Sequence, residues 1–252
     1  MKNIRLRNLT RSAFATALVG VIAVTGFTAC SNTPKQSATV PSTEVSITDF
    51  TKANEGISGC GSWSISKDTK VTDDLNLLCK KAMHRLVGAD FTPVAYLGSQ
   101  VVAGTNHCFL CKERIVYPGA APQYSLVYIH ENFNNESEIK NIDNIVLPGM
   151  SDSLPDGTKK LGGWKYTEEA EITPELASVI EKAAQSKLGA KYEPIANIGL
   201  QIVSGTNHAV ICKVTPVSPD ASSKYAMVYV YESLDGKCEI TEVSELDLFA
   251  QL

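Results

Sequence analysis

The chain has 252 residues, of which 44% are hydrophobic and 20% are charged, and its formal net charge is −4. This composition fits one or two folded domains and excludes a disordered chain. No apolar run reaches about 18 residues, which excludes an integral membrane bundle. Beyond residue 29 the chain carries 19 basic and 27 acidic side chains. Because a nucleic-acid binder needs a basic face, we expect no nucleic-acid partner.

Residues 1–29 have the organisation of a bacterial secretion signal, with four basic residues before an apolar stretch from Ala13 to Phe27. The stretch ends in Phe27-Thr28-Ala29-Cys30, which resembles a lipobox, although Phe27 stands where that motif prefers Leu. The resemblance implies a lipid such as palmitate on Cys30 and an exported protein anchored to the bacterial cell envelope. The alternative is an ordinary secretory peptide with an incidental cysteine.

Residues 30–55 are rich in Ser, Thr and Pro and contain few large apolar side chains. Such a composition is typical of a flexible tether that holds a folded domain away from a surface. Export would also place the remaining cysteines outside the reducing cytosol, where disulfides are allowed.

The chain contains an internal repeat with an offset of 101 residues. Residues 91–112 (FTPVAYLGSQVVAGTNHCFLCK) and 192–213 (YEPIANIGLQIVSGTNHAVICK) are identical at 11 of 22 positions without a gap. The same offset relates Trp63 to Trp164. A duplication of this kind predicts two copies of one structural unit.

Both repeats show the same order of expected elements. A short strand lies around Trp63 or Trp164, and a helix follows with Thr72 or Thr173 as its N-cap and Pro174 at the first helical position of the second copy. The helices carry an apolar stripe at helical spacing, formed by Leu75, Leu78, Cys79, Ala82, Met83 and Leu86 in the first copy and by Leu176, Val179, Ile180 and Ala183 in the second.

Only strands are expected after each helix, which Gly88 or Gly189 would end in a left-handed conformation. Alternating Tyr, Val and Ile predict strands in the second copy at about 192–203, 207–217, 224–232 and 238–248. The strongest hairpin turns lie at 102–106 and 203–207. The pattern predicts an α+β fold in two domains, each with a four- to five-stranded antiparallel sheet wrapped around one helix. We place the domains at 56–149 and 157–252, joined by a linker at 150–156.

Each predicted hairpin contains the pattern Gln-x-Val-x-Gly. In the first copy it is Gln100-Val101-Val102-Ala103-Gly104, and in the second it is Gln201-Ile202-Val203-Ser204-Gly205. A glycine also precedes each first strand, as Gly61 in the first copy and as the pair Gly162 and Gly163 in the second. Pattern and context together resemble the cystatins, proteinaceous inhibitors of papain-like cysteine peptidases.

The resemblance implies that the glycine-bearing trunk and two hairpin turns form a wedge, which enters the active-site cleft of a papain-like cysteine peptidase and blocks it reversibly. It implies no enzyme activity and no cofactor. The apolar pairs Val101-Val102 and Ile202-Val203 would gain by leaving water, and a rigid hairpin loses little entropy on binding. We expect the glutamines to offer an amide to the partner.

The second hairpin departs from the family pattern. Many cystatins carry Pro-Trp there, whereas this chain has Glu131-Asn-Phe-Asn-Asn-Glu136 and Glu232-Ser-Leu-Asp-Gly-Lys237. Phe133 or Leu234 would have to replace the missing aromatic anchor. One alternative is that Gln-x-Val-x-Gly is only the turn chemistry of this fold. Another is a non-inhibitory module that binds a surface protein or peptide with the same edge.

His107 and Cys108 invite a catalytic interpretation, but Ala209 replaces Cys108 in the second copy and neighbouring strand residues point to opposite faces. Cys108 and Cys111 also lack the spacing of paired zinc knuckles, so we expect no metal site. Disulfides from Cys79 to Cys111 and from Cys60 to Cys108 are possible, as are buried free thiols.

Overall fold

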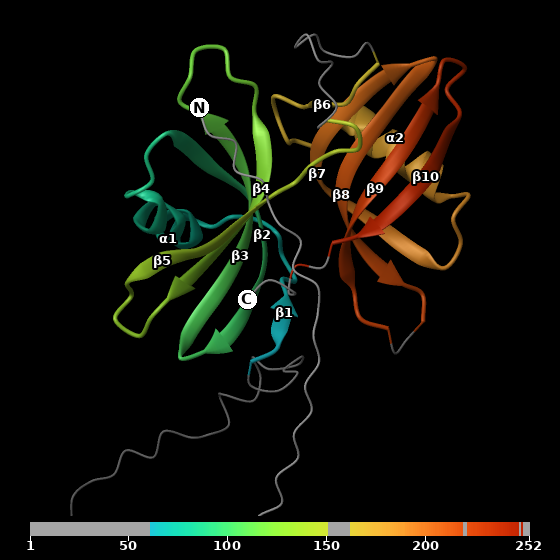
Figure 1. Cartoon of the computed structure of the whole chain (residues 1–252). Coiled ribbons are helices and arrows are strands. Elements are labelled where there is room, and N and C mark those ends of the chain that lie inside the picture. Colours follow the sequence, from blue (N-terminus) through green and yellow to red (C-terminus); the bar gives the residue numbers. More distant parts are fainter. Residues whose placement is uncertain (1–60, 151–161, 219–220, 247, 249–252) are drawn as a thin grey trace, which may run out of the picture. The chain divides into compact units, whose positions relative to one another are not determined.

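The computed structural model describes residues 61–150, 162–218, 221–246 and 248. In these residues the chain forms two five-stranded antiparallel sheets and two helices, one helix to each repeat (Figure 1). The α+β class predicted from the sequence is confirmed. Both repeats belong to one compact unit.

The first repeat forms a sheet whose strands neighbour one another in chain order, from β1 to β5. Every neighbouring pair is antiparallel. Its elements are β1 (Trp63–Ile65), α1 (Asp73–Met83), β2 (Ala89–Val102), β3 (Gly104–Ile115), β4 (Gln123–Glu131) and β5 (Ser137–Asn144).

The second repeat has the same order of elements and the same strand order in its sheet. Its elements are β6 (Lys165–Tyr166), α2 (Pro174–Ala184), β7 (Ala190–Val203), β8 (Gly205–Pro216), β9 (Lys224–Ser233) and β10 (Cys238–Glu245). The four long strands agree with the ranges predicted from alternation to within about three residues. Local sequence pattern was therefore sufficient to find them.

Both helices begin where the sequence predicts. The Thr72 hydroxyl accepts a hydrogen bond of 3.4 Å from the Leu75 backbone N–H, and the Thr173 hydroxyl accepts one of 3.3 Å from Leu176. These bonds satisfy one of the four N–H groups that a helix leaves unpaired at its start. Pro174 occupies the first position of α2, as expected.

The predicted helix ends are wrong by several residues. The C-caps are His84 and Gln185, although Gly88 and Gly189 do have positive φ values of 98° and 103°. Leu86, predicted as the last residue of the apolar stripe, lies beyond the end of α1 and is 39% exposed, so the stripe contacts the sheet only as far as Met83. The glycines instead turn the chain into β2 and β7.

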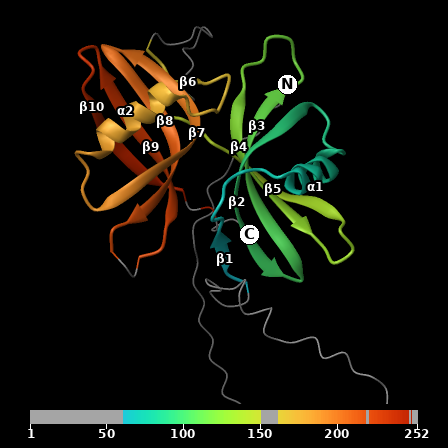
Figure 2. The same cartoon turned by 180° about the vertical axis from the view of Figure 1, so that it is seen from behind.

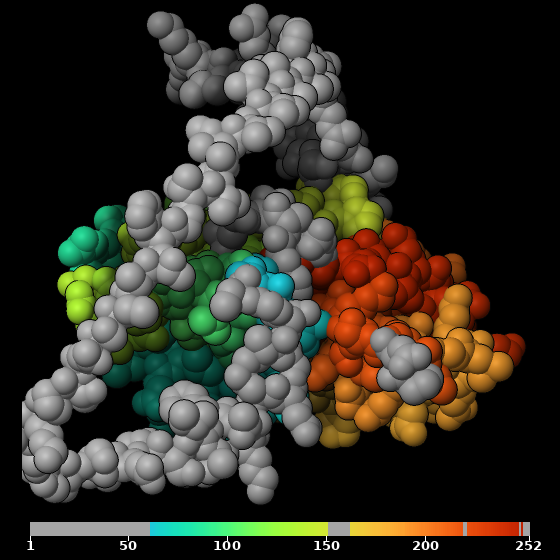
Figure 3. Space-filling view, turned by 90° about the horizontal axis from the view of Figure 1, so that it is seen from below, coloured from blue at the N-terminus to red at the C-terminus, as the bar shows by residue number. Residues whose placement is uncertain are grey.

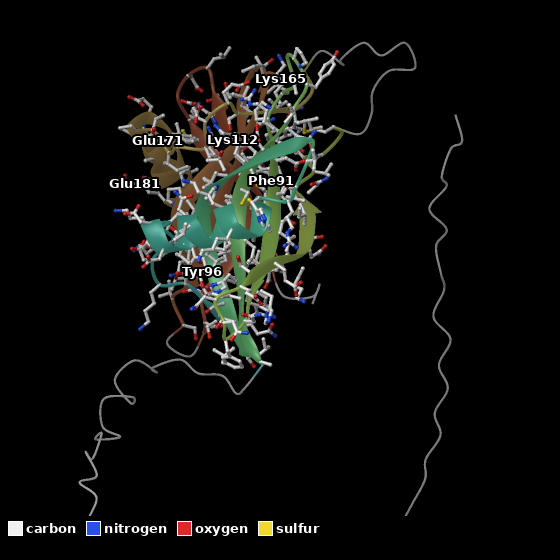
Figure 4. All side chains as sticks on the ribbon, turned by 90° about the vertical axis from the view of Figure 1, so that its left-hand side faces the viewer. Phe91, Tyr96, Lys112, Lys165, Glu171 and Glu181 are labelled. Carbon is white, nitrogen blue, oxygen red and sulfur yellow. The ribbon has the colours of Figure 1, made fainter. Side chains whose placement is uncertain are left out.

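Each helix lies across one face of its own sheet, as Figures 1 and 2 show from opposite sides. In the first repeat, Leu78, Cys79 and Ala82 of α1 pack on Phe109 and Val127 of the sheet. Phe91 and Tyr96 of β2 flank α1 in Figure 4. The matching cluster of the second repeat joins α2 to β8 and β9.

The other face of each sheet is also buried. One hydrophobic cluster contains residues of both repeats, with Leu97, Leu110 and Tyr124 from the first and Ile198 and Ile211 from the second. This shared cluster joins the two sheets, so the division into two domains remains a prediction. The cystatin-like fold remains a prediction as well.

Candidate functional site

The first hairpin of each repeat has a one-residue tip. Val102 pairs with Gly104 around Ala103, and Val203 pairs with Gly205 around Ser204. The two glycines have φ values of 116° and 131°, a region that residues with a side chain rarely adopt. The turn is the one expected from the sequence.

Gly104 and Gly205 are also required by close packing. A Cβ atom on Gly104 would collide with the carbonyl oxygen of Glu131, and one on Gly205 would collide with that of Glu232. Glu131 ends β4, and Glu232 lies next to the end of β9, so each first tip lies against the turn that leads to the last strand of its repeat. The motif glycine therefore brings the two hairpin turns together.

Gln100 ties the chain before β1 to this tip. Its Nε2 donates a 2.7 Å hydrogen bond to the carbonyl of Gly61, and its Oε1 accepts one of 2.7 Å from Nδ2 of Asn106. The backbone N–H of Gly61 donates to the carbonyl of Val101 at 3.2 Å. The predicted trunk glycine is therefore held beside the hairpin.

The second repeat builds the same network at the equivalent positions. Gln201 donates to the carbonyl of Gly162 at 2.7 Å and accepts from Asn207 at 2.8 Å. Gly163 follows and is half-buried. The glutamine amides thus bind within each repeat, where the sequence had suggested a bond to a partner. Asn106 and Asn207 were not recognised as functional, although both repeats contain Thr-Asn-His at this point.

The apolar residues of the motif are exposed. Val101 and Ile202 are 66% and 61% exposed, and Val102 and Val203 remain accessible beside them. Their chain neighbours Ala103 and Ser204 are exposed as well. Together with the trunk they form a narrow, partly apolar surface. In the space-filling view the cyan surface that begins the described chain lies beside the green surface of the first repeat (Figure 3).

The second hairpin turn contributes one exposed apolar residue per repeat. Phe133 is 83% exposed and Leu234 is 87% exposed. We call the trunk glycine, the first tip and this turn the hairpin edge of a repeat, formed by Gly61, Val101, Val102, Ala103 and Phe133 in the first and by Gly162, Ile202, Val203, Ser204 and Leu234 in the second.

His107 lies on β3, three residues after Gly104, and is half-buried. Its Nδ1 is 3.1 Å from the Tyr96 hydroxyl, and its Nε2 is 3.7 Å from Oε2 of Glu131. Burial lowers the pKa of His107, and the negative charge of Glu131 raises it by a smaller amount. In the second repeat His208 lies 3.3 Å from Glu232. Each histidine thus connects the first hairpin to the end of the neighbouring strand.

The cysteines of the described residues are free thiols. Cys79 and Cys111 share the helix-facing cluster, whereas Cys108 faces the cluster common to both sheets. Burial raises the pKa of Cys79 and of Cys212 to about 12, and it also raises the pKa of Cys108. Such thiols are poor nucleophiles. Cys60 lies outside the described residues, so its possible bond to Cys108 stays a prediction.

Within the described ranges, no group of three or more His, Cys, Asp or Glu side chains is placed to hold a metal ion. In the same part of the chain no helix has both the length and the apolarity to cross a membrane. The predicted signal at 1–29, the lipid site Cys30, the tether at 30–55 and most of the linker fall outside it.

No protein-family model matches this chain, and no curated protein matches it.

Proposed function

We propose that the chain is a reversible inhibitor of papain-like cysteine peptidases, which it blocks by inserting a hairpin edge into the active-site cleft. One observation carries the proposal. In each repeat the trunk glycine, the first tip and the second turn lie side by side, held by the glutamine bond and by the close approach at the motif glycine.

The exposed apolar side chains of this edge supply the driving force. Burying a valine such as Val101 in a partner cleft contributes about 1 to 2 kcal/mol, and the hairpin pairing keeps the entropy cost of binding low. In this proposal the edge occludes the cleft without a covalent step, and we assign the chain no enzyme activity. Phe133 and Leu234 take the place of the aromatic anchor that many cystatins carry.

The engaged glutamine amides favour a second candidate function. Because Gln100 and Gln201 are explained by the bonds that hold the trunk, the motif can persist in a module that binds a surface protein or peptide without inhibiting a peptidase. Both functions use the same edge, and an inhibition assay separates them.

The assay titrates the full chain against papain with a fluorogenic peptide substrate. We expect inhibition that dilution reverses. Val101→Asp combined with Ile202→Asp should weaken it at least 10-fold, because a charge then enters the cleft. The matched control is Val116→Asp with Val217→Asp, an equivalent pair of exposed valines beyond the opposite ends of β3 and β8, and it should inhibit like the wild type. If micromolar protein gives no inhibition, the result contradicts the inhibitor and favours the non-inhibitory binding module.

Export and a lipid on Cys30 complete the proposal and place the inhibitor at the bacterial cell envelope. Radiolabelled palmitate should enter the wild-type chain and not the Cys30→Ser variant. Equal labelling of both chains would contradict the anchor.

A further inference from the structure

The two repeats contact each other through reciprocal pairs of equivalent residues. The Tyr124 hydroxyl donates to the carbonyl of Thr167 at 3.1 Å, and Tyr225, its equivalent, donates to the carbonyl of Ser66 at 3.4 Å. Ser66 and Thr167 are themselves equivalent at the offset of 101. When residue i of one unit meets j of the other and j meets i, the units are related by an approximate twofold axis.

The lysines Lys112 and Lys213 form a second reciprocal pair, with Lys112 labelled in Figure 4. The Lys112 ammonium donates to the carbonyl of Glu168 at 3.0 Å, and that of Lys213 donates to the carbonyl of Lys67 at 3.4 Å. Glu168 and Lys67 are again equivalent positions, so the twofold relation does not depend on one contact.

The register of these contacts gives the relative direction of the hairpins. Ser66 donates its backbone N–H to Leu97 of β2. Leu97 lies five residues before Val102, the last residue of β2 at the first tip. Lys213, which contacts Ser66 at 3.0 Å, lies eight residues after Gly205 opens β8. A position five residues from one tip thus meets a position eight residues from the other. Parallel hairpins would instead bring positions at equal distances from their tips together.

Contacts at the two ends agree with this direction. The Tyr128 hydroxyl, three residues from the tip end of β4, donates to the carbonyl of Leu248 beyond β10 at 2.7 Å. The Tyr166 hydroxyl, in the strand that follows the second trunk, donates to the carbonyl of Ile145 beyond β5 at 2.6 Å. The tip end of each repeat therefore meets the far end of the other.

We infer that the chain is two-headed: its hairpin edges face away from each other and bind two peptidase molecules at once. This rests on the proposed function of the edge. The contact region lies six to seven residues from each tip, or about 20 Å at the rise of a strand, so the tips are about 40 Å apart. A globular partner of about 200 residues has a radius of gyration of about 17 Å, so two fit without overlap.

Light scattering on the full chain with excess papain tests this directly. We expect two papain molecules per chain, and one for either single-edge variant, Val101→Asp or Ile202→Asp. One papain per wild-type chain would overturn the two-headed arrangement and leave the inhibitory function intact. No complex together with no inhibition would overturn the proposed function itself.

A distance measurement tests the geometry without any peptidase. Spin labels attached through an encoded non-natural amino acid at Ala103 and Ser204 should give a distance of about 40 Å. Hairpins that point the same way would give about 10 to 15 Å, the spacing of packed sheets, and that result would overturn the inference.

Discussion

Different residues of the Gln-x-Val-x-Gly pattern have different structural roles in the hairpin edge. Gln100 and Gln201 hold the trunk, Gly104 and Gly205 admit the second turn, and the residues between them stay exposed. The sequence predicted these residues as a candidate site, and that assignment stays a prediction. From the sequence we expected the glutamine to bind a partner protein. The sequence could not show its actual hydrogen-bond partner, because that depends on which residue lies opposite it in the sheet. Asn106 lies there, paired with Gln100.

Gly104→Ala tests whether the motif glycine is needed for packing as well as for its positive φ. We expect a loss of at least about 2 kcal/mol of unfolding free energy, because the added methyl meets the carbonyl of Glu131. Gly119→Ala is the control, since Gly119 also has a positive φ but no atom within 4 Å of the added carbon, and it should lose about 1 kcal/mol. Urea unfolding measures both, and equal losses would remove the packing role.

His107 should make the stability of the protein depend on pH. Burial lowers its pKa in the folded state from 6.5, so the unfolded chain takes up the proton first as pH falls. The contribution of His107 is complete above pH 6.5 and decreases as the pH falls through its lowered pKa. Unfolding free energies at pH 7.5 and 5.5 should differ more for the wild type than for His107→Gln. The same difference in both would assign the effect to other groups.

At the scale of elements, helix starts and strands follow from local pattern. Thr72 and Thr173 cap the helices, and alternation marks the strands. The helix ends could not be predicted from Gly88 and Gly189, because the helix stops where its contact with the sheet stops. That position depends on how far the sheet extends beneath it.

Two neighbouring leucines of α1 test the packing of the helix. Leu78 is 7% exposed and Leu77 is 52% exposed. Leu78→Ala should lose about 2 to 4 kcal/mol of unfolding free energy, because it leaves a cavity against the sheet. Leu77→Ala should change it by less than about 0.5 kcal/mol. Thermal and urea unfolding measure both, and a similar effect of the two would contradict the orientation of the helix.

At the scale of the whole molecule, both faces of each sheet are covered. β4 is buried from Tyr124 to Ile129 without interruption. Such a run is typical of a strand with neighbours on both faces. In the sequence it corresponds to the nearly continuous apolar run Tyr-Ser-Leu-Val-Tyr-Ile, which was the available signal for contact between the repeats. The prediction of a sheet with one helix on it accounted for only one of these faces.

The shared hydrophobic cluster predicts that the repeats unfold together. Trp63 and Trp164 provide one fluorescent reporter in each repeat. The single-tryptophan variants Trp63→Phe and Trp164→Phe should give urea transitions with midpoints that coincide after correction for each substitution. Two separate transitions, with one repeat unfolding while the other remains folded, would show that the cluster contributes little.

The sequence by itself determined the duplicated order of elements, the caps and the glycine-tipped hairpins, because these follow from neighbours a few residues apart. Only the tertiary structure decided which groups the glutamines bind, where the helices stop and how the two sheets face each other. Those features depend on residues far apart in the chain. The two repeats carry the same pattern, and only the contacts between their side chains select the reciprocal, opposed arrangement.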